Sequence, residues 1–282
     1  RRFIAVSTRA NSFQDSRPPP DAVPVTVLLE TPTSLRCSVP PMPPEAARDT
    51  SRTPPCETFA EHIATLPQWE RELLASATEQ DFSDSSLCEL LQQKNTTILA
   101  ASDGGQKDDH GSFGWVIGTQ DEVICDCEGV ARGYPMQSYR AEGYGRMSLL
   151  LFLAHYIRFY NIKPAAGLRV ISYCDSSSLL KAEEAFHSKD VDSSSWYLKP
   201  DHDVIMTLSE VRKGLPFQLI SRHVKSHQDD EREYDDLSRP EQLNVLADHG
   251  ATAALDELRA ADGTKELYPL PAHRAYLRDA SG

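Results

Sequence analysis

Apolar positions early in the chain recur at helical spacing. Between residues 57 and 77 the large apolar side chains lie three or four residues apart, which predicts an amphipathic helix. Pro67 falls inside this stretch and predicts a kink or a division into two helices. A second short helix is predicted from Ser83 to Gln93, with Ser83 as its N-cap. We expect these helices to pack against the elements that follow.

From residue 97 onward, short apolar runs alternate with turn residues, which is typical of strands. The first three runs predict an antiparallel meander, because short turns containing Gly or Asp join them. They are Ile98–Asp103, Gly111–Thr119 and Glu122–Ala131. A long helix is predicted from Arg140 to Tyr160. The next run, Leu168–Cys174, is continuously apolar, which indicates a strand covered on both faces, as in parallel pairs.

The remaining elements complete a mixed order of strands and helices. They are predicted helices at Leu179–Phe186 and Pro200–Lys213, a strand at Phe217–Val224, and a helix at Pro240–Ala260 that is opened by Ser238 and closed near Gly263. This order predicts an α/β fold. Its sheet would be mixed and five-stranded, with three antiparallel strands followed by two parallel strands, and helices would flank both faces.

The N-terminal segment differs from the rest of the chain in its proline content. Eleven of the nineteen prolines lie between Arg1 and Glu57, a density typical of a linker or of weakly ordered chain. We therefore expect a Pro-rich segment at 1–56, a helical connection at 57–96, the α/β domain at 97–262, and a tail or the start of a linker at 263–282. The chain begins without Met, so we expect a fragment of a longer polypeptide.

Composition narrows the class of protein further. No apolar run approaches the roughly 20 residues of a membrane span, and no signal peptide is evident, so we expect an intracellular protein without a membrane partner. The six cysteines lack the spacing of a zinc module, and Cys125 and Cys127 are interpreted as small core residues. The net charge of −13 opposes binding to phosphates, although clustered carboxylates neutralised by a metal would also contribute to it.

One apolar strand ends on a lone carboxylate, Asp103, followed by Gly104 and Gly105. The two glycines predict a turn directly after Asp103, which would place this side chain at a sheet edge, facing solvent or a metal. An isolated Asp-Gly pair also forms turns without any further role. A functional interpretation of Asp103 therefore depends on other parts of the chain.

Three further carboxylates lie where the predicted architecture can bring them to Asp103. Asp175 ends another strand, Glu142 opens the long helix, and Asp248 lies in the final helix. Carboxylates at one site repel each other unless cations lie between them, and hard oxygen ligands suit Mg²⁺ or Mn²⁺. Paired metals can activate a water, stabilise a leaving oxygen and so cleave a phosphodiester.

Five segments in this order resemble the ribonuclease H domain of retroelement reverse transcriptases. The resemblance extends from about Thr97 to Ala261. It is carried by Ser102–Gly105 with Gly111–Ile117, then by Ser138–Glu142, Ile171–Ser176, His223–Asp230 and Asn244–Asp248. It implies the ribonuclease H-like fold and cleavage of the RNA strand of RNA–DNA hybrids. It also implies a parent polyprotein in which a reverse transcriptase is covalently linked to this domain.

The resemblance also assigns roles to residues. Asp103, Glu142, Asp175 and Asp248 fall on the four metal-ligand carboxylates of the family, which would hold two Mg²⁺ ions, with Mn²⁺ able to substitute. His227 falls on the histidine of a flexible loop near the attacking water or the departing product. His223 is interpreted as a strand residue.

Candidate substrate contacts surround these positions. For the phosphates they are Arg140, Arg146, Arg222 and Lys225, each of which could equally be a solvated surface residue. For the sugar hydroxyls of the RNA strand they are the backbone of Gly104 and Gly105 and polar groups near Ser138. The loop between His227 and Asp248 is long and acidic, and no basic protrusion is evident, so we expect weak affinity for hybrid.

Two other classes of function stay open. A relative with the same fold, such as an integrase, a transposase or a 3′-exonuclease, fits the segment His223–His227 and the late Asp248 less well. A catalytically silent domain that binds hybrid or a protein partner is disfavoured because the carboxylate set is intact.

Overall fold

The computed structural model describes residues 56–79, 86–133, 135–187, 199–261 and 270. They belong to a compact unit that extends from Pro55 to Ala272. The second unit, made of 1–54 and 273–282, lies outside the described residues, and with it nearly all of the predicted Pro-rich segment. Among the described residues, no helix is long and apolar enough to cross a membrane.

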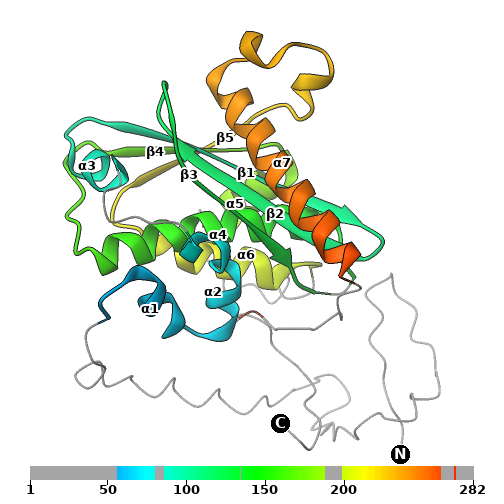
Figure 1. Ribbon diagram of the computed structural model, residues 1–282, viewed down its shortest axis with the longest axis horizontal. Coiled ribbons are helices and arrows are strands. Elements are labelled where there is room, and N and C mark those ends of the chain that lie inside the picture. The colour runs from blue at the N-terminus through cyan, green and yellow to red at the C-terminus, as the bar shows by residue number, and fades with distance from the viewer. Residues whose placement is uncertain (1–55, 80–85, 134, 188–198, 262–269, 271–282) are drawn as a thin grey trace, which may run out of the picture. The chain divides into compact units, whose positions relative to one another are not determined.

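The described unit is built on one five-stranded sheet (Figure 1). Its strands are β1 (Thr97–Lys107), β2 (His110–Gly118), β3 (Val123–Ala131), β4 (Arg169–Cys174) and β5 (Gln218–His223), in the order β3-β2-β1-β4-β5. β1, β2 and β3 pair antiparallel, whereas β4 pairs parallel with both β1 and β5. The predicted mixed α/β fold is confirmed.

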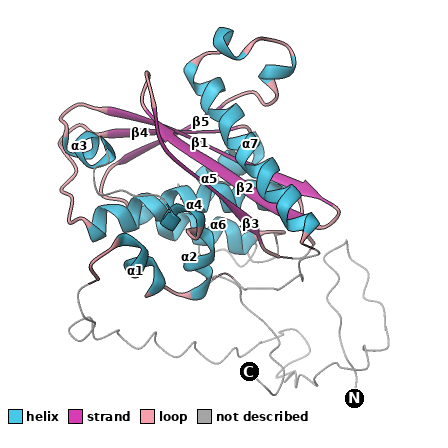
Figure 2. Ribbon diagram, viewed as in Figure 1, coloured by secondary structure: helices cyan, strands magenta, loops and turns pink. Residues whose placement is uncertain are grey.

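Three helices pack on the two faces of this sheet, and a fourth, α6, packs against α4 and α5 (Figure 2). They are α4 (Ser138–Phe159), α5 (Ser177–His187), α6 (His202–Lys213) and α7 (Arg239–Ala260). Two glycines show which helix covers which face. Gly104 of β1 pairs with Phe113 of β2, so it lies on the face opposite to that of the next residue, Gly114. A Cβ added to Gly104 would meet α4, whereas one added to Gly114 would meet α7. Since side chains alternate along a strand, α4 and α7 lie on opposite faces of the sheet.

The larger hydrophobic core lies on the α4 face. It includes Trp115 of β2 and Phe152 of α4, whose rings are tilted at a centroid distance of 4.9 Å. The Trp115 indole donates a hydrogen bond to Ser148 Oγ at 2.8 Å, which satisfies the one polar atom of its ring. Cys125 and Cys127 are both buried in this core, as predicted.

Short N-terminal helices complete the same core. They are α1 (Phe59–Ala64), α2 (Gln68–Leu73) and α3 (Ser86–Gln92), with a 3₁₀ turn at Ser76–Glu79. The predicted division at Pro67 is confirmed, because this residue immediately precedes α2. Phe59 of α1 meets the rings of Phe152 and Tyr156 edge-on at 5.9 and 5.8 Å. The predicted N-cap Ser83 lies outside the described residues.

The turn predicted at Gly104 and Gly105 is wrong. β1 continues through both glycines, which pair with Phe113 and Ser112 of β2, and the chain turns only at Asp108 and Asp109, both with positive φ. Glycine serves packing at this place: a Cβ added to Gly104 would lie 2.1 Å from the backbone nitrogen of Glu142. Glycine thus lets α4 approach β1 closely, and Asp103 lies within a central strand, not at a sheet edge.

Candidate active site

Asp103 and Asp175 lie level with each other where β4 ends. The last registered pair between β1 and β4 is Ala101 with Tyr173, and each aspartate is two residues beyond it. β1 continues past this point, whereas β4 stops at Cys174. Parallel pairing therefore brings the two aspartates together although 72 positions separate them.

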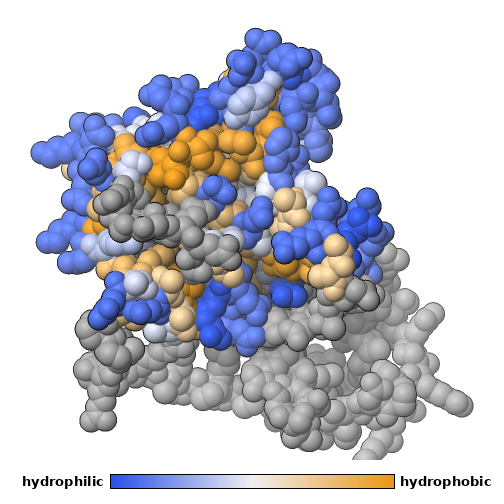
Figure 3. Space-filling model, in the orientation of Figure 1, coloured by the Kyte–Doolittle hydropathy of each residue, from blue (hydrophilic) through white to orange (hydrophobic). Residues whose placement is uncertain are grey.

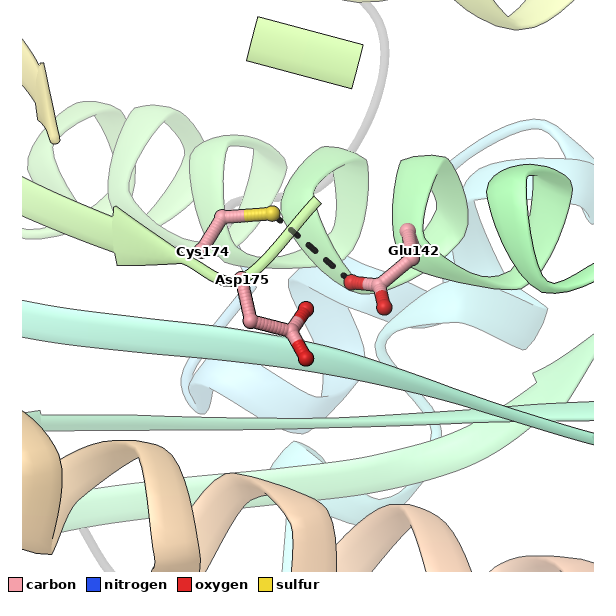
Figure 4. A group of neighbouring side chains, drawn as sticks. All are labelled: Glu142, Cys174 and Asp175. Carbon is pink, nitrogen blue, oxygen red and sulfur yellow. Dashed lines mark hydrogen bonds between the residues drawn. The ribbon is translucent and has the colours of Figure 1, made fainter. Parts of the chain in front are cut away.

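Glu142 approaches the same place from the second turn of α4. Cys174 donates a hydrogen bond from its thiol to Glu142 Oε2 at 3.7 Å. One ligand atom each of Glu142, Cys174 and Asp175 lies within 4.8 Å of the other two. Figure 4 shows both carboxylates and the sulfur gathered between the end of β4 and α4. The backbone of Gly104 lies against the same turn of α4 and fixes its height above the sheet.

Asp248 reaches the group from α7, on the opposite face. α7 lies close to β2, because a Cβ added to Gly114 would be 2.2 Å from the Ala247 carbonyl oxygen. Gly114 is the cross-strand partner of Asp103, so both positions face α7. The proximity of Asp248 is also visible in its electrostatic effect on Asp103.

Burial and mutual repulsion alter the acidity of this group. Burial, followed by the charges of Asp175 and Asp248, raises the pKa of Asp103 from 3.8 to about 7. Burial, followed by the neighbouring Cys174, Asp103 and Asp175, raises the pKa of Glu142 well above its usual range. Burial also raises the pKa of the Cys174 thiol to about 11, so this thiol carries a proton at neutral pH.

The chemistry of these side chains fits a divalent cation. Asp175 Oδ1 is buried and accepts no hydrogen bond from any described residue. An acceptor of this kind is costly unless a partner is supplied. A hard cation with oxygen ligands would use this atom and would relieve the repulsion that raises the pKa of Asp103 and Glu142. Asp103, Glu142, Asp175 and Asp248 are the residues that could hold it.

These pKa shifts predict how the metal-free protein responds to pH. Between about pH 4 and pH 7 the folded protein binds more protons at Asp103 than the unfolded chain does, so the free energy of unfolding falls as pH rises. Removing this carboxyl with Asp103→Asn should therefore stabilise the metal-free protein increasingly from pH 5 to pH 8. Urea unfolding in a chelator at several pH values measures the difference. A difference that is constant over this range would contradict the shift.

The prediction that Arg140 contacts phosphate is wrong. Its guanidinium is buried and forms a bidentate ion pair with Asp203 of α6, with distances of 2.7 Å from Nη2 and 3.0 Å from Nη1. Arg140 also donates to Asp201 at 3.0 Å and to the Arg132 carbonyl at 2.6 Å. All of its charge is therefore used to attach α6 and the chain before α4 to the start of this helix.

Arg146 is not a phosphate contact either. It has no exposed surface, and its Nε lies 2.5 Å from Glu183 Oε2 of α5. The same guanidinium donates to Ser172 of β4 at 2.9 Å and to Ser221 of β5. The sequence showed a basic residue in the predicted long helix, but its acidic and hydroxyl partners come from segments far along the chain.

The other predicted contacts lie at or near the surface. Ser138, Arg222, Lys225 and His227 are exposed, while Gly104 and Gly105 are half-buried. His227 adopts a left-handed backbone conformation just before the 3₁₀ turn Gln228–Asp230, in the loop between β5 and α7. These six residues stay predictions as substrate contacts or, for His227, as a catalytic residue.

Three residues beside the carboxylates were given no role in the site by the sequence. Cys174 had no visible signal, because no other cysteine lies at metal-ligand spacing from it. The strand residue His223 has its Nε2 3.0 Å from the Asp175 carbonyl oxygen, which ties β5 to the end of β4. Asn244 is buried one helical turn before Asp248, and its Oδ1 has no hydrogen-bond partner among the described residues. Its spacing of four from Asp248 was the available signal.

Comparisons with known proteins find similarity in solved structures alone. No protein-family model and no curated protein matches the chain. The structure is similar to that of ribonuclease H1 from the archaeon Halobacterium salinarum NRC-1, with 17% identity, coverage of 57% of this chain and 98% of that one, and a TM-score of 0.37.

Two further structures show likeness of the same extent. LC11-RNase H1 in complex with an RNA/DNA hybrid has 14% identity, covers 57% of this chain and 99% of its own, and gives a TM-score of 0.38. The PFV RNase H domain in solution has 16% identity, covers 58% of this chain and 96% of its own, and gives a TM-score of 0.41. At these identities the function has to be argued from the side chains of the site itself.

Proposed function

We propose that this protein is a metal-dependent endonuclease that cleaves the RNA strand of RNA–DNA hybrids, a ribonuclease H. The observation that carries the proposal is the meeting of Asp103, Glu142 and Asp175, with Asp248 beside them, at the end of β4. This grouping leaves one buried carboxylate oxygen without a partner and holds two carboxyl groups at raised pKa. A structural ion-pair network would instead bring basic partners to these carboxylates.

In this proposal the four carboxylates hold two Mg²⁺ ions, for which Mn²⁺ can substitute. Bound divalent cations supply activation of a water and stabilisation of the leaving oxygen. The chain's contribution is to fix its ligands on rigid elements: Asp103 within a central strand, Asp175 at a strand end, and Glu142 and Asp248 on long helices. Such placement holds the ligands before substrate arrives.

Other residues of the chain would bind the substrate. Arg222 and Lys225 are exposed and can contact phosphates, although Lys225 also lies 3.5 Å from Glu231. His227 is exposed on its loop and can exchange a proton with water or with the leaving product. Backbone groups of Gly104 and Gly105 and the hydroxyl of Ser138 are the proposed contacts to the 2′-hydroxyls.

The surface near this site predicts weak binding of hybrid by the isolated chain. The loop before α7 carries a run of acidic residues, including Asp229, Asp230 and Glu231, and Figure 3 shows a hydrophilic surface over it. We propose that this chain is part of a retroelement polyprotein and that a linked reverse transcriptase supplies the missing affinity. In that arrangement residues 57–96 form the connection to the preceding domain.

A cleavage assay with three labelled substrates tests the proposal. RNA–DNA hybrid, double-stranded RNA and double-stranded DNA are each incubated with the full chain, with and without Mg²⁺ or Mn²⁺. We expect internal cuts in the RNA strand of the hybrid, only when metal is added. Cleavage or strand transfer of DNA would instead indicate an integrase-like or exonuclease activity. No cleavage of any substrate at millimolar metal would indicate a binding domain.

A further inference from the structure

The candidate active site contains one ligand that is foreign to a magnesium site. Cys174 is the last residue of β4, directly before Asp175, and it is fully buried. Its sulfur lies 3.7 Å from Glu142 Oε2. In Figure 4 the sulfur and the two carboxylates converge from the end of β4 and from α4. A thiol in this position adds a soft ligand to a group of hard ones.

The spacing of the three ligand atoms suits a single ion. They lie within 4.8 Å of one another. Tetrahedral Zn²⁺ with bonds of about 2.0–2.3 Å holds its ligand atoms about 3.3–3.8 Å apart, so side-chain rotations that move the atoms by about 1 Å would close the group around one ion. The buried Asp175 Oδ1 has no hydrogen-bond partner among the described residues, which leaves a ligand atom free for this purpose.

We propose that Glu142, Cys174 and Asp175 form a binding site for thiophilic divalent cations. Zn²⁺ and Cd²⁺ are the ions of this class with which the site can be tested. Thiolate ligands select such ions, whereas Mg²⁺ prefers oxygen ligands alone. On binding, the thiol releases its proton to solvent and the sulfur bonds to the metal. Because Glu142 and Asp175 are shared, Zn²⁺ excludes Mg²⁺ from the site and inhibits cleavage, and this last consequence rests on the proposed function.

Titration of the reduced full chain with Cd²⁺ tests the site directly. Cadmium bound to a thiolate produces an ultraviolet charge-transfer band, which reports the sulfur ligand and requires no activity. We expect the part of this absorbance that appears at the lowest Cd²⁺ concentrations to be lost in Cys174→Ser. It should remain in Cys88→Ser, a matched control in α3, where Cys88 Sγ accepts a hydrogen bond from Gln92 at 3.1 Å. Identical titrations of wild type and Cys174→Ser would overturn the proposal.

A second variant keeps the thiol and changes the carboxylate. Glu142→Gln retains Cys174, so the cadmium–thiolate band should persist, but its midpoint should move to a Cd²⁺ concentration more than about tenfold higher. Circular dichroism of each variant confirms that it is folded. An unchanged midpoint in folded Glu142→Gln would show that Cys174 binds cadmium without this carboxylate, which contradicts the three-ligand site.

The same measurements separate this inference from the proposed function. Hybrid cleavage in Mg²⁺ with no loss of the cadmium band in Cys174→Ser would overturn the thiophilic site alone. A band lost in Cys174→Ser, in a protein that cleaves no hybrid, would support the metal site and overturn the ribonuclease proposal. Where both hold, added Zn²⁺ should inhibit cleavage by wild type at concentrations more than about tenfold lower than it inhibits Cys174→Ser.

Discussion

Replacing Asp103 with asparagine is expected to abolish hybrid cleavage and to leave the fold intact. Asp103 lies among Asp175, Asp248 and Glu142, and its carboxylate would be one of the ligands that hold the bound cations. A catalytic metal contributes several kcal/mol to the transition state. Since about 1.4 kcal/mol is a tenfold change in rate, loss of this ligand should lower cleavage by about a hundredfold or more. The rate on labelled hybrid at saturating Mg²⁺ measures it.

Stability measurements distinguish lost chemistry from lost folding. Asparagine nearly matches aspartate in shape and removes a charge that repels its neighbours, so the metal-free variant should melt no lower than wild type. The increase in melting temperature that Mg²⁺ causes should shrink, because ligand binding stabilises only the folded state. Asp121→Asn, which changes an exposed carboxylate in the turn between β2 and β3, is the matched control and should behave as wild type. Full activity in Asp103→Asn would refute the site.

Replacing Arg146 with alanine is expected to lower the free energy of unfolding by about 3–5 kcal/mol. The side chains of Arg146 and Glu183 have relative accessibilities of 0% and 1%, so the change leaves a buried carboxylate with one partner fewer. It also removes the hydrogen bonds to Ser172 and Ser221 on two neighbouring strands. Arg212 still lies 3.1 Å from Glu183 and limits the loss. Urea unfolding of the metal-free protein measures the change.

Two further variants test whether the unpaired charge causes this loss. Arg146→Met combined with Glu183→Leu removes both charges and fills the space, so it should be markedly more stable than Arg146→Ala. Lys213→Ala breaks an exposed ion pair with Glu210, which should change stability by less than about 1 kcal/mol. An effect of Arg146→Ala as small as that of Lys213→Ala would contradict the role of the buried pair.

The sheet could be predicted because each strand is an apolar run bounded by turn residues, a pattern that depends only on neighbouring positions. Short turns separate β1, β2 and β3. The apolar run of β4 indicated a central strand of the kind found in parallel pairs, and the structure places β4 between β1 and β5. The turn after β1 could not be predicted correctly. Gly104 is required by the close approach of α4, and that contact involves Glu142, 38 positions away.

The candidate site also contains residues that the sequence predicted correctly and residues that it did not. Asp175 directly follows an apolar run, so its position at a strand end was visible in the sequence, and parallel register then sets it level with Asp103. For Arg140 and Arg146 the pattern gave the wrong answer. Both lie in the first turns of a helix that carries a proposed ligand, yet Asp203 and Glu183 neutralise them within the protein. A basic side chain looks the same in sequence whether its partner is a phosphate or a buried carboxylate.

By itself, the sequence determined the order of strands and helices and the carboxylates that follow or open them, because hydrophobic periodicity and capping are properties of neighbouring residues. The tertiary structure decided that β1 continues past Asp103, that Arg140 and Arg146 are internal, and that Cys174 joins Glu142 and Asp175. Each of these outcomes depends on burial or on charge pairing between elements that are distant along the chain. Such contacts depend on the packing of α4 and α5 on the sheet and of α6 against these two helices.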